Sequence, residues 1–292
     1  MGEIVGAGLL AHVPTIMLSE EIRRSLNGGE DTSLVTGLER LRSSVFETLD
    51  YDTVLVVDSH WATTVEFVVA SHALRAGLHT SSELPRGMCR IPYEFEGDPE
   101  LARTIAALGP DGGTWITAND DPYLPIYYGT LNLWHYLGVA GKAWVSVSVC
   151  QTGEPDDFLT FGAVIGKAVA ELDRKVLVIG SGAMSHTFWP LKQIRDHEAA
   201  GVEHIFTPEA AAADFERLGW LEAGRHGDVI ATMDSYSRFR PEARFAHYLT
   251  MVGAIGGTSC RAEAQRYSEY ENSVGTGQIH LWFPRPQEGW TT

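Results

Sequence analysis

The chain has few cysteines, few basic side chains and no long apolar run. Its 292 residues include 3 cysteines, Cys89, Cys150 and Cys260, whose spacing fits no metal knuckle, so we expect a reducing compartment and no disulfide framework. With 22 basic against 38 acidic residues, the net charge of -16 argues against nucleic acid or an anionic membrane as partner. No stretch approaches the roughly 20 apolar residues of a membrane span, and the N-terminus lacks a signal-peptide pattern. These absences predict a soluble, cytoplasmic protein.

What the sequence does contain is an alternation of strand and helix patterns, with 44% hydrophobic residues available for a core. Such alternation is typical of an α/β fold. We expect residues 1–292 to form a single domain, with a central mostly parallel or mixed sheet flanked by helices. An irregular stretch at 71–97 is expected over the sheet edge, and a helix at 242–255.

Three of the expected strands end in a histidine. The strands are predicted at residues 4–10, 53–57 and 175–179. They lead into His12, His60 and His186. Ligands of open α/β sheets bind at the carboxyl ends of the strands, so these imidazoles are expected to meet there if the strands are neighbours. Imidazole is the commonest metal ligand and titrates near neutral pH, which predicts an active site built from histidines.

Two histidines with one carboxylate would form a facial triad that leaves one face of the metal open. This arrangement is typical of non-haem Fe(II) oxygenases, although zinc accepts similar ligands. The candidate carboxylates are Asp58, Glu94, Asp120, Asp121 and Glu242. Composition does not select among them. Glu242 follows Pro241 at an expected helix start, where an anion is favoured.

Two other catalytic patterns are poorly matched. The segment from Ser181 to Ser185 lacks the G-x-S-x-G spacing of a nucleophile elbow, which disfavours a serine hydrolase. Gly275 and Gly277 fall short of a dinucleotide fingerprint.

Five ordered segments resemble the motifs of the class III extradiol ring-cleavage dioxygenases, the family of the protocatechuate 4,5-dioxygenase catalytic subunit. They are LAHVPT at 10–15, DSHW at 58–61, SGAMSH at 181–186, EARF at 242–245 and GTGQ at 275–278. The resemblance covers about residues 4 to 284. Within the family the chain is most similar to the homoprotocatechuate (3,4-dihydroxyphenylacetate) 2,3-dioxygenase branch. That closer likeness is carried by TSSELP at 80–85, YEFEGDPEL at 93–101 and YGTL at 128–131.

The resemblance implies Fe(II) held by His12, His60 and Glu242, with His186 as the acid–base residue. It implies insertion of both atoms of O₂ into a substituted catechol, giving a ring-opened semialdehyde in aromatic catabolism. Many family members place a second active-site histidine where this chain has Tyr128, so we predict a catalytic or substrate-binding role for that tyrosine. Further predicted contacts to the ring substituent are His79, Arg86 and Arg90.

Other functions compete with this interpretation. Another catechol, an aminophenol, gallate or a dihydroxypyridine would fit the same chemistry. A zinc hydrolase would use the same ligands, and a non-catalytic binding protein would keep only the fold. Aromatic side chains such as Trp220 and Trp282 are candidates for burial in a homo-oligomer.

Overall fold

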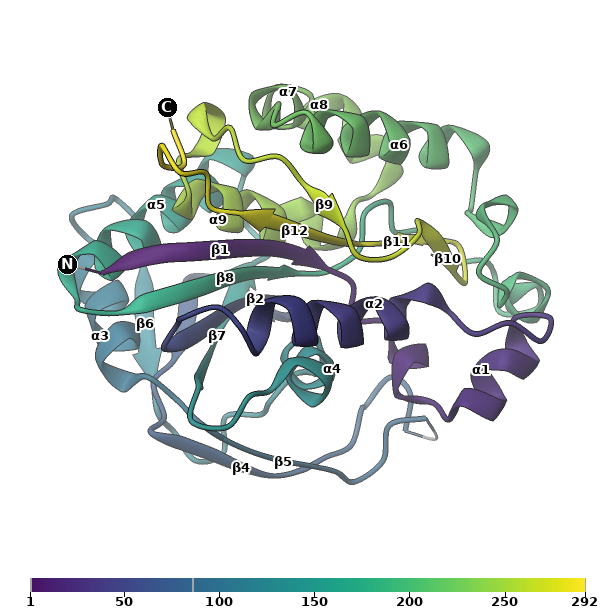
Figure 1. Cartoon of the computed structure of the whole chain (residues 1–292), viewed down its shortest axis with the longest axis horizontal. Helices are drawn as coiled ribbons and strands as arrows, with labels where there is room; N and C mark the ends of the chain where they lie inside the picture. Colours follow the sequence, from purple (N-terminus) through teal and green to yellow (C-terminus); the bar gives the residue numbers. More distant parts are fainter. Residues whose placement is uncertain (1, 86, 292) are drawn as a thin grey trace.

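The computed structural model describes residues 2–85 and 87–291. Its main feature is an eight-stranded sheet in the order β6-β3-β7-β2-β8-β1-β12-β9 (Figure 1). The strands of this sheet are β1 (Glu3–Leu10), β2 (Thr53–Thr63), β3 (Phe67–Ala70), β6 (Ile116–Asn119), β7 (Ala143–Cys150), β8 (Lys175–Ser181), β9 (Gln265–Arg266) and β12 (His280–Pro284). The central strands β7, β2, β8 and β1 run parallel, whereas β12 pairs antiparallel with β1 and β3 antiparallel with β7. The α/β fold with a mixed sheet is confirmed.

Helices cover both faces of the sheet (Figure 1). They are α1 (Glu20–Leu26), α2 (Ser33–Leu41), α3 (Pro99–Leu108), α4 (Tyr128–Leu137), α5 (Pro155–Glu171), α6 (Pro208–Glu222), α7 (His226–Ala231), α8 (Met233–Tyr236) and α9 (Ala246–Ala254). Alternate side chains of a strand point to opposite faces, and β2 shows this directly. Leu55 and Val57 join the hydrophobic core under α5 and α9, whereas Val54 and Val56 join the core under α2 and α4. Among the described residues, no helix has the length and apolar character needed to cross a membrane.

Strand β2 is longer than predicted and carries a functional segment. It runs to Thr63, and its pairing with β7 shifts register between Asp58 and Ala62. A register shift of this kind bends a strand and redirects its side chains. The polar residues Ser59 and His60 therefore lie within the strand rather than after it.

The prediction that the stretch at 71–97 is irregular is wrong on both sides of the loop at 80–90. The stretch forms the hairpin β4 (Leu74–His79) and β5 (Ile91–Glu96), which pair antiparallel outside the main sheet. Exposed apolar side chains on β4 and Pro92 on β5 hide the alternation that marks a half-buried strand. The hairpin holds both ends of the loop at 80–90, most of which is described.

The predicted helix at 242–255 is wrong in its first turn. Ala243, Arg244 and Phe245 have φ values of 46°, 61° and 63°, so regular helix begins only with α9 at Ala246. Left-handed conformations are costly for residues with a side chain, and they concentrate at functional sites. Glu242 therefore lies on a tight turn before the helix, not at its N-terminus.

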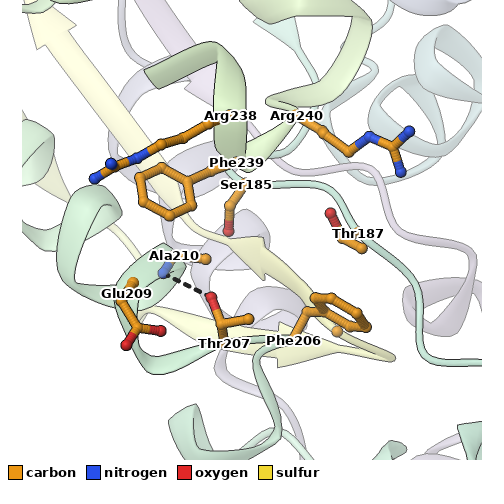
Figure 2. Close-up of a pocket in the computed structure, with 10 residues that line it drawn as sticks. Ser185, Thr187, Phe206, Thr207, Glu209, Ala210, Arg238, Phe239 and Arg240 are labelled. Carbon is orange, nitrogen blue, oxygen red and sulfur yellow. Dashed lines mark hydrogen bonds between the residues drawn. The ribbon is translucent and has the colours of Figure 1, made fainter. Parts of the chain in front are cut away.

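Two further β-strands, β10 (Glu271–Ser273) and β11 (Thr276–Gln278), form a small hairpin beside the segment that follows β8. A cavity of about 440 Å³ opens next to this segment (Figure 2). Ser185, Thr187 and Phe239 contribute to its lining.

Candidate active site

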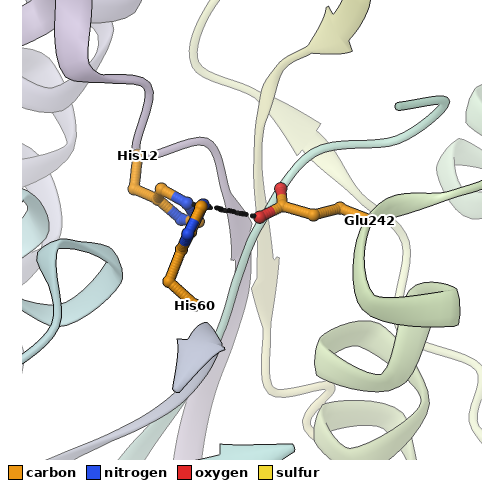
Figure 3. A group of neighbouring side chains, drawn as sticks. All are labelled: His12, His60 and Glu242. Carbon is orange, nitrogen blue, oxygen red and sulfur yellow. Dashed lines mark ion pairs between the residues drawn. The ribbon is translucent and has the colours of Figure 1, made fainter. Parts of the chain in front are cut away.

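Three side chains from distant parts of the chain meet at the carboxyl edge of the sheet (Figure 3). His12 follows β1, His60 lies in β2, and Glu242 lies on the turn before α9. One ligand atom from each residue lies within 4.8 Å of the other two. The Nε2 atoms of His12 and His60 are 3.5 Å and 3.1 Å from Glu242 Oε1. We call these residues the three-ligand cluster.

Glu242 is the carboxylate that the geometry selects from the five candidates. Asp58 is also buried, but its Oδ2 accepts hydrogen bonds from the amide and the hydroxyl of Thr130, at 2.6 Å and 2.8 Å. It therefore anchors the start of α4. The remaining candidates are exposed: Glu94, Asp120 and Asp121.

The tautomer of His12 follows from its hydrogen bond to Ser181. The Ser181 hydroxyl donates to the carbonyl of Gly129 at 2.7 Å, and a carbonyl can only accept. Its oxygen must therefore accept from His12 Nδ1, which lies 2.8 Å away. In the neutral ring the lone pair is then on Nε2, the nitrogen that faces Glu242, as a metal ligand requires.

Glu242 is almost completely buried and is held as an anion. Its two oxygens accept hydrogen bonds of 2.5 Å each, from the Ser59 hydroxyl and the Ala183 amide. Burial alone would raise the pKa of Glu242, but His12, His186 and His60 hold it well below its usual range. A buried carboxylate facing two imidazoles favours a bound cation.

When no metal is bound, the His60 ring is protonated on both nitrogens near neutral pH. Burial would lower its pKa, but hydrogen bonds to Glu242 and Glu83 raise the pKa to about 10. Its Nε2 faces Glu242, and its Nδ1 lies 3.4 Å from Glu83 Oε1. A metal bound at Nε2 must therefore displace a proton from this ring.

Tyr128 contacts the cluster directly. Its hydroxyl lies 2.7 Å from His60 Nε2 and donates to Glu83 Oε2 at 3.0 Å. Burial, followed by the charges of Glu83 and Glu242, raises the pKa of Tyr128 well above its usual value. The group is thus a neutral hydrogen-bonding hydroxyl and not a base near neutral pH.

His186 lies near enough to interact electrostatically with all three residues of the cluster, but it is not one of them. Its ring is half-buried after β8 and lies 4.7 Å from the ring of Phe188, edge to face. Burial lowers the pKa of His186, and the charge of Glu242 only partly offsets this effect. The imidazole is therefore neutral near pH 7 and able to accept a proton.

Sequence reasoning missed Glu83, Ser181 and Ser59 as members of the site. Glu83 lies within the TSSELP segment, which drew notice only for its likeness to one branch of the family. Nothing in its spacing indicates that the loop at 80–90 brings it to His60. Ser181 and Ser59 adjoin recognised motifs, and their roles depend on contacts across the sheet.

The predicted substrate contacts are only partly described. His79 is half-buried at the end of β4, and burial lowers its pKa. Arg90 is exposed in the left-handed region with a φ of 55°. Arg86 lies outside the described residues. The substrate roles of all three stay predictions.

Comparisons with known proteins identify the class. Residues 6–283 match the family described as the catalytic LigB subunit of aromatic ring-opening dioxygenase. The chain belongs to this family and is a ring-cleaving dioxygenase.

Two relatives extend the comparison. The chain is 30% identical over 262 residues to a 3,4-dihydroxyphenylacetate 2,3-dioxygenase of Escherichia coli, covering 88% of this chain and 91% of that one. It also matches the crystal structure of an uncharacterised protein from Escherichia coli K12 with a TM-score of 0.64 and 15% identity. That match covers 96% of this chain and 99% of the other, and supports the fold alone.

Proposed function

We propose that this protein is an Fe(II)-dependent extradiol dioxygenase that inserts both atoms of O₂ into a substituted catechol. The proposed substrate is 3,4-dihydroxyphenylacetate or a near relative, and the product is a ring-opened semialdehyde. The observation that carries the proposal is the three-ligand cluster, in which two Nε2 atoms face one oxygen of a buried carboxylate.

The donor set fits ferrous iron. Two neutral imidazoles and one carboxylate are the ligands of non-haem Fe(II) oxygenases, and the tautomer of His12 leaves Nε2 free to bind. When bound, Fe(II) supplies a Lewis acid that favours the ionised diol and a redox centre that brings O₂ and the ring together.

The chain's own side chains then handle protons and orientation. His186, neutral because burial lowers its pKa, accepts a proton from a catechol hydroxyl and later returns it as an acid. Tyr128 offers a neutral hydroxyl, 2.7 Å from His60 Nε2, to hydrogen-bond a substrate oxygen. Glu83 holds that hydroxyl in place.

The substrate assignment draws on the printed name of the Escherichia coli relative and on the branch likeness of the sequence. Tyr128, where many family members have a histidine, is the position at which preference for an aminophenol, gallate or dihydroxypyridine would arise. A single catalytic domain, assembly into a homo-oligomer and a cytoplasmic location stay predictions.

Oxygen uptake tests the proposal. The metal-free protein is loaded anaerobically with Fe(II), mixed with oxygen and a panel of catechols and aminophenols, and followed by oxygen electrode and absorbance. Uptake with 3,4-dihydroxyphenylacetate and a yellow product, both lost in His186→Ala, is expected. Turnover of another ring alone would replace the substrate. No uptake from iron-loaded protein with any ring would contradict the proposal.

A further inference from the structure

A fully buried carboxylate lies outside the three-ligand cluster, on helix α6. Asp214 accepts hydrogen bonds from the hydroxyls of Tyr270, Tyr236 and Ser185, at 2.5, 2.7 and 2.7 Å. The amide of Ser185 also donates to it, at 3.2 Å. Burial raises the pKa of Asp214, and these hydrogen bonds oppose that rise. A buried carboxyl with four donors is costly to assemble, which suggests a role beyond filling space.

Asp214 binds Ser185, which directly precedes His186. The carbonyl of Met184, the residue before Ser185, accepts a hydrogen bond from the Glu242 amide at 3.1 Å. The His186 amide in turn donates to the carbonyl of Phe239 at 3.3 Å. Asp214 therefore anchors a short segment that connects a cluster ligand with the candidate acid–base residue.

Met184 packs in the core, but the residues after it lie beside a cavity. Ser185 and Thr187 line the cavity of about 440 Å³ beside it, so one side of the chain around His186 meets open space (Figure 2). A side chain next to a void lacks the dispersion contacts that hold a core residue in one position. The hydrogen bonds of Ser185 to Asp214 add a fixed point beside this cavity, in addition to the core packing of Met184 and the backbone hydrogen bonds of the segment.

Gly277, in the GTGQ segment, makes room for the contact between Asp214 and Ser185. A Cβ at Gly277 would lie 2.3 Å from Asp214 Oδ2 and 2.3 Å from the Tyr270 hydroxyl. The backbone of Gly277 pairs with the same segment, donating to Ser185 O and accepting from Met184 N, each at 2.9 Å. The absence of a side chain at 277 thus lets the strand and the carboxylate reach Ser185 together.

We propose that Asp214 is a positioning residue that fixes the Met184–His186 segment and thereby sets the place of the His186 ring for proton transfer. The inference rests on the proposed function for the role of His186. Asp214 acts through Ser185, and its hydrogen bonds to the described residues reach no member of the three-ligand cluster.

The test compares Asp214→Asn with Asp98→Asn. Asp98 is a matched control because it is also buried and accepts hydrogen bonds from the Leu101 amide, the Thr53 hydroxyl and the Arg174 guanidinium. Thr53 begins β2, so Asp98 lies at the opposite edge of the sheet from the cluster. Each variant is assayed for melting temperature, Fe(II) binding, kcat and KM, and for the NMR chemical shifts of the His186 ring in metal-free protein.

We expect Asp214→Asn to lower kcat by about tenfold or more, while KM and Fe(II) binding change by less than about threefold. The His186 ring signals should shift. Asp98→Asn should have a lower melting temperature than the wild type. Its kcat should stay within about twofold of the wild-type value, and its His186 signals should not shift. Tyr270→Phe, which removes one donor, should change kcat and the signals in the same direction by less.

Wild-type kcat and unshifted His186 signals in folded Asp214→Asn would overturn the inference. If that variant does not fold, Tyr270→Phe and Ser185→Ala decide, and wild-type values in both would overturn it. Failure of the proposed function has a different signature, namely no oxygen uptake by the wild-type holoenzyme with any ring. The NMR comparison uses metal-free protein and still tests the anchor in that case.

Discussion

At the scale of single residues, the site depends on where protons lie. The Ser181 hydroxyl has one proton and donates it to the Gly129 carbonyl. It must therefore accept a hydrogen bond from His12 Nδ1, which leaves Nε2 as the nitrogen that faces the cluster. His60 lies between Glu242 and Glu83 and is protonated in the metal-free protein. Metal-binding histidines commonly depend on such outer partners for their orientation.

Replacing Ser181 by Ala removes the acceptor that fixes the His12 ring. We expect the affinity for Fe(II), measured anaerobically by equilibrium binding, to fall about 10- to 100-fold. Ser148→Ala is the matched control, because Ser148 is equally buried and accepts from the Val68 amide. An affinity unchanged in Ser181→Ala, or lowered equally in Ser148→Ala, would contradict the assigned role.

The raised pKa of His60 predicts that metal binding releases a proton. Its pKa of about 10 lies above the usual value, so the stabilisation from the His60–Glu242 pair is fully present below about pH 6.5 and is lost as the pH rises through 10. A cation competes with that proton. Apparent affinity for Zn²⁺, used as a non-oxidising probe in calorimetry, should rise about tenfold per pH unit between about pH 7 and 9. Affinity independent of pH would show that His60 is not a ligand.

At the scale of elements, a buried histidine joins the end of β1 to helix α2. His280 Nδ1 accepts from the Ala11 amide at 3.2 Å, and its Nε2 lies 3.1 Å from the carbonyl of Leu34, to which it donates. The amide held by this contact belongs to the residue before His12. The pairing of β1 with β12 thus extends to the backbone next to a cluster ligand.

Acid should weaken this connection. Burial lowers the pKa of His280 to about 3, so between about pH 3 and 6.5 the unfolded chain binds a proton that the folded chain does not. The free energy of unfolding therefore falls as the pH falls through this window, by up to about 1.4 kcal/mol per pH unit from this residue.

Urea denaturation of metal-free protein at about pH 7 and about pH 5 measures the effect. In His280→Gln the loss of stability between the two pH values should be smaller than in the wild type, although the variant is less stable at both. An equal pH dependence in the two proteins would mean that His280 does not stay neutral when buried.

At the scale of the whole molecule, the three-ligand cluster joins distant parts of the chain, because His12 follows β1, His60 lies in β2 and Glu242 lies on the turn before α9. A metal that binds only the folded state stabilises it, by about 4 kcal/mol at a thousandfold excess over Kd. Anaerobic Fe(II) should therefore raise the melting temperature of the wild type by several degrees, and a chelator should reverse the rise. Glu242→Ala should show no rise, and an equal rise there would locate the metal elsewhere.

Much of this architecture could be predicted from the sequence because strands buried on both faces leave a continuous apolar signal. The runs before His12, His60 and His186 mark three neighbouring parallel strands, β1, β2 and β8. The hairpin β4–β5 was not predicted, because exposed apolar side chains on β4 and Pro92 on β5 obscure the alternation that marks a half-buried strand.

Long-range contacts limited the prediction of the site. Composition left five carboxylates open. The place of Glu242 after Pro241 gave one argument for it, but only the resemblance selected it as a ligand. The left-handed turn at Ala243 to Phe245 contains no glycine, so the sequence does not indicate it. Glu83 reaches His60 from a loop whose path depends on the hairpin at its ends.

The most direct test is to locate the metal in the folded protein. Crystals are grown anaerobically with Fe(II), and anomalous diffraction is recorded on both sides of the iron absorption edge. The account predicts one strong peak between His12 Nε2, His60 Nε2 and the Glu242 carboxylate, absent in Glu242→Ala. Iron at another position, in crystals of protein that consumes oxygen with a catechol, would contradict the proposed centre.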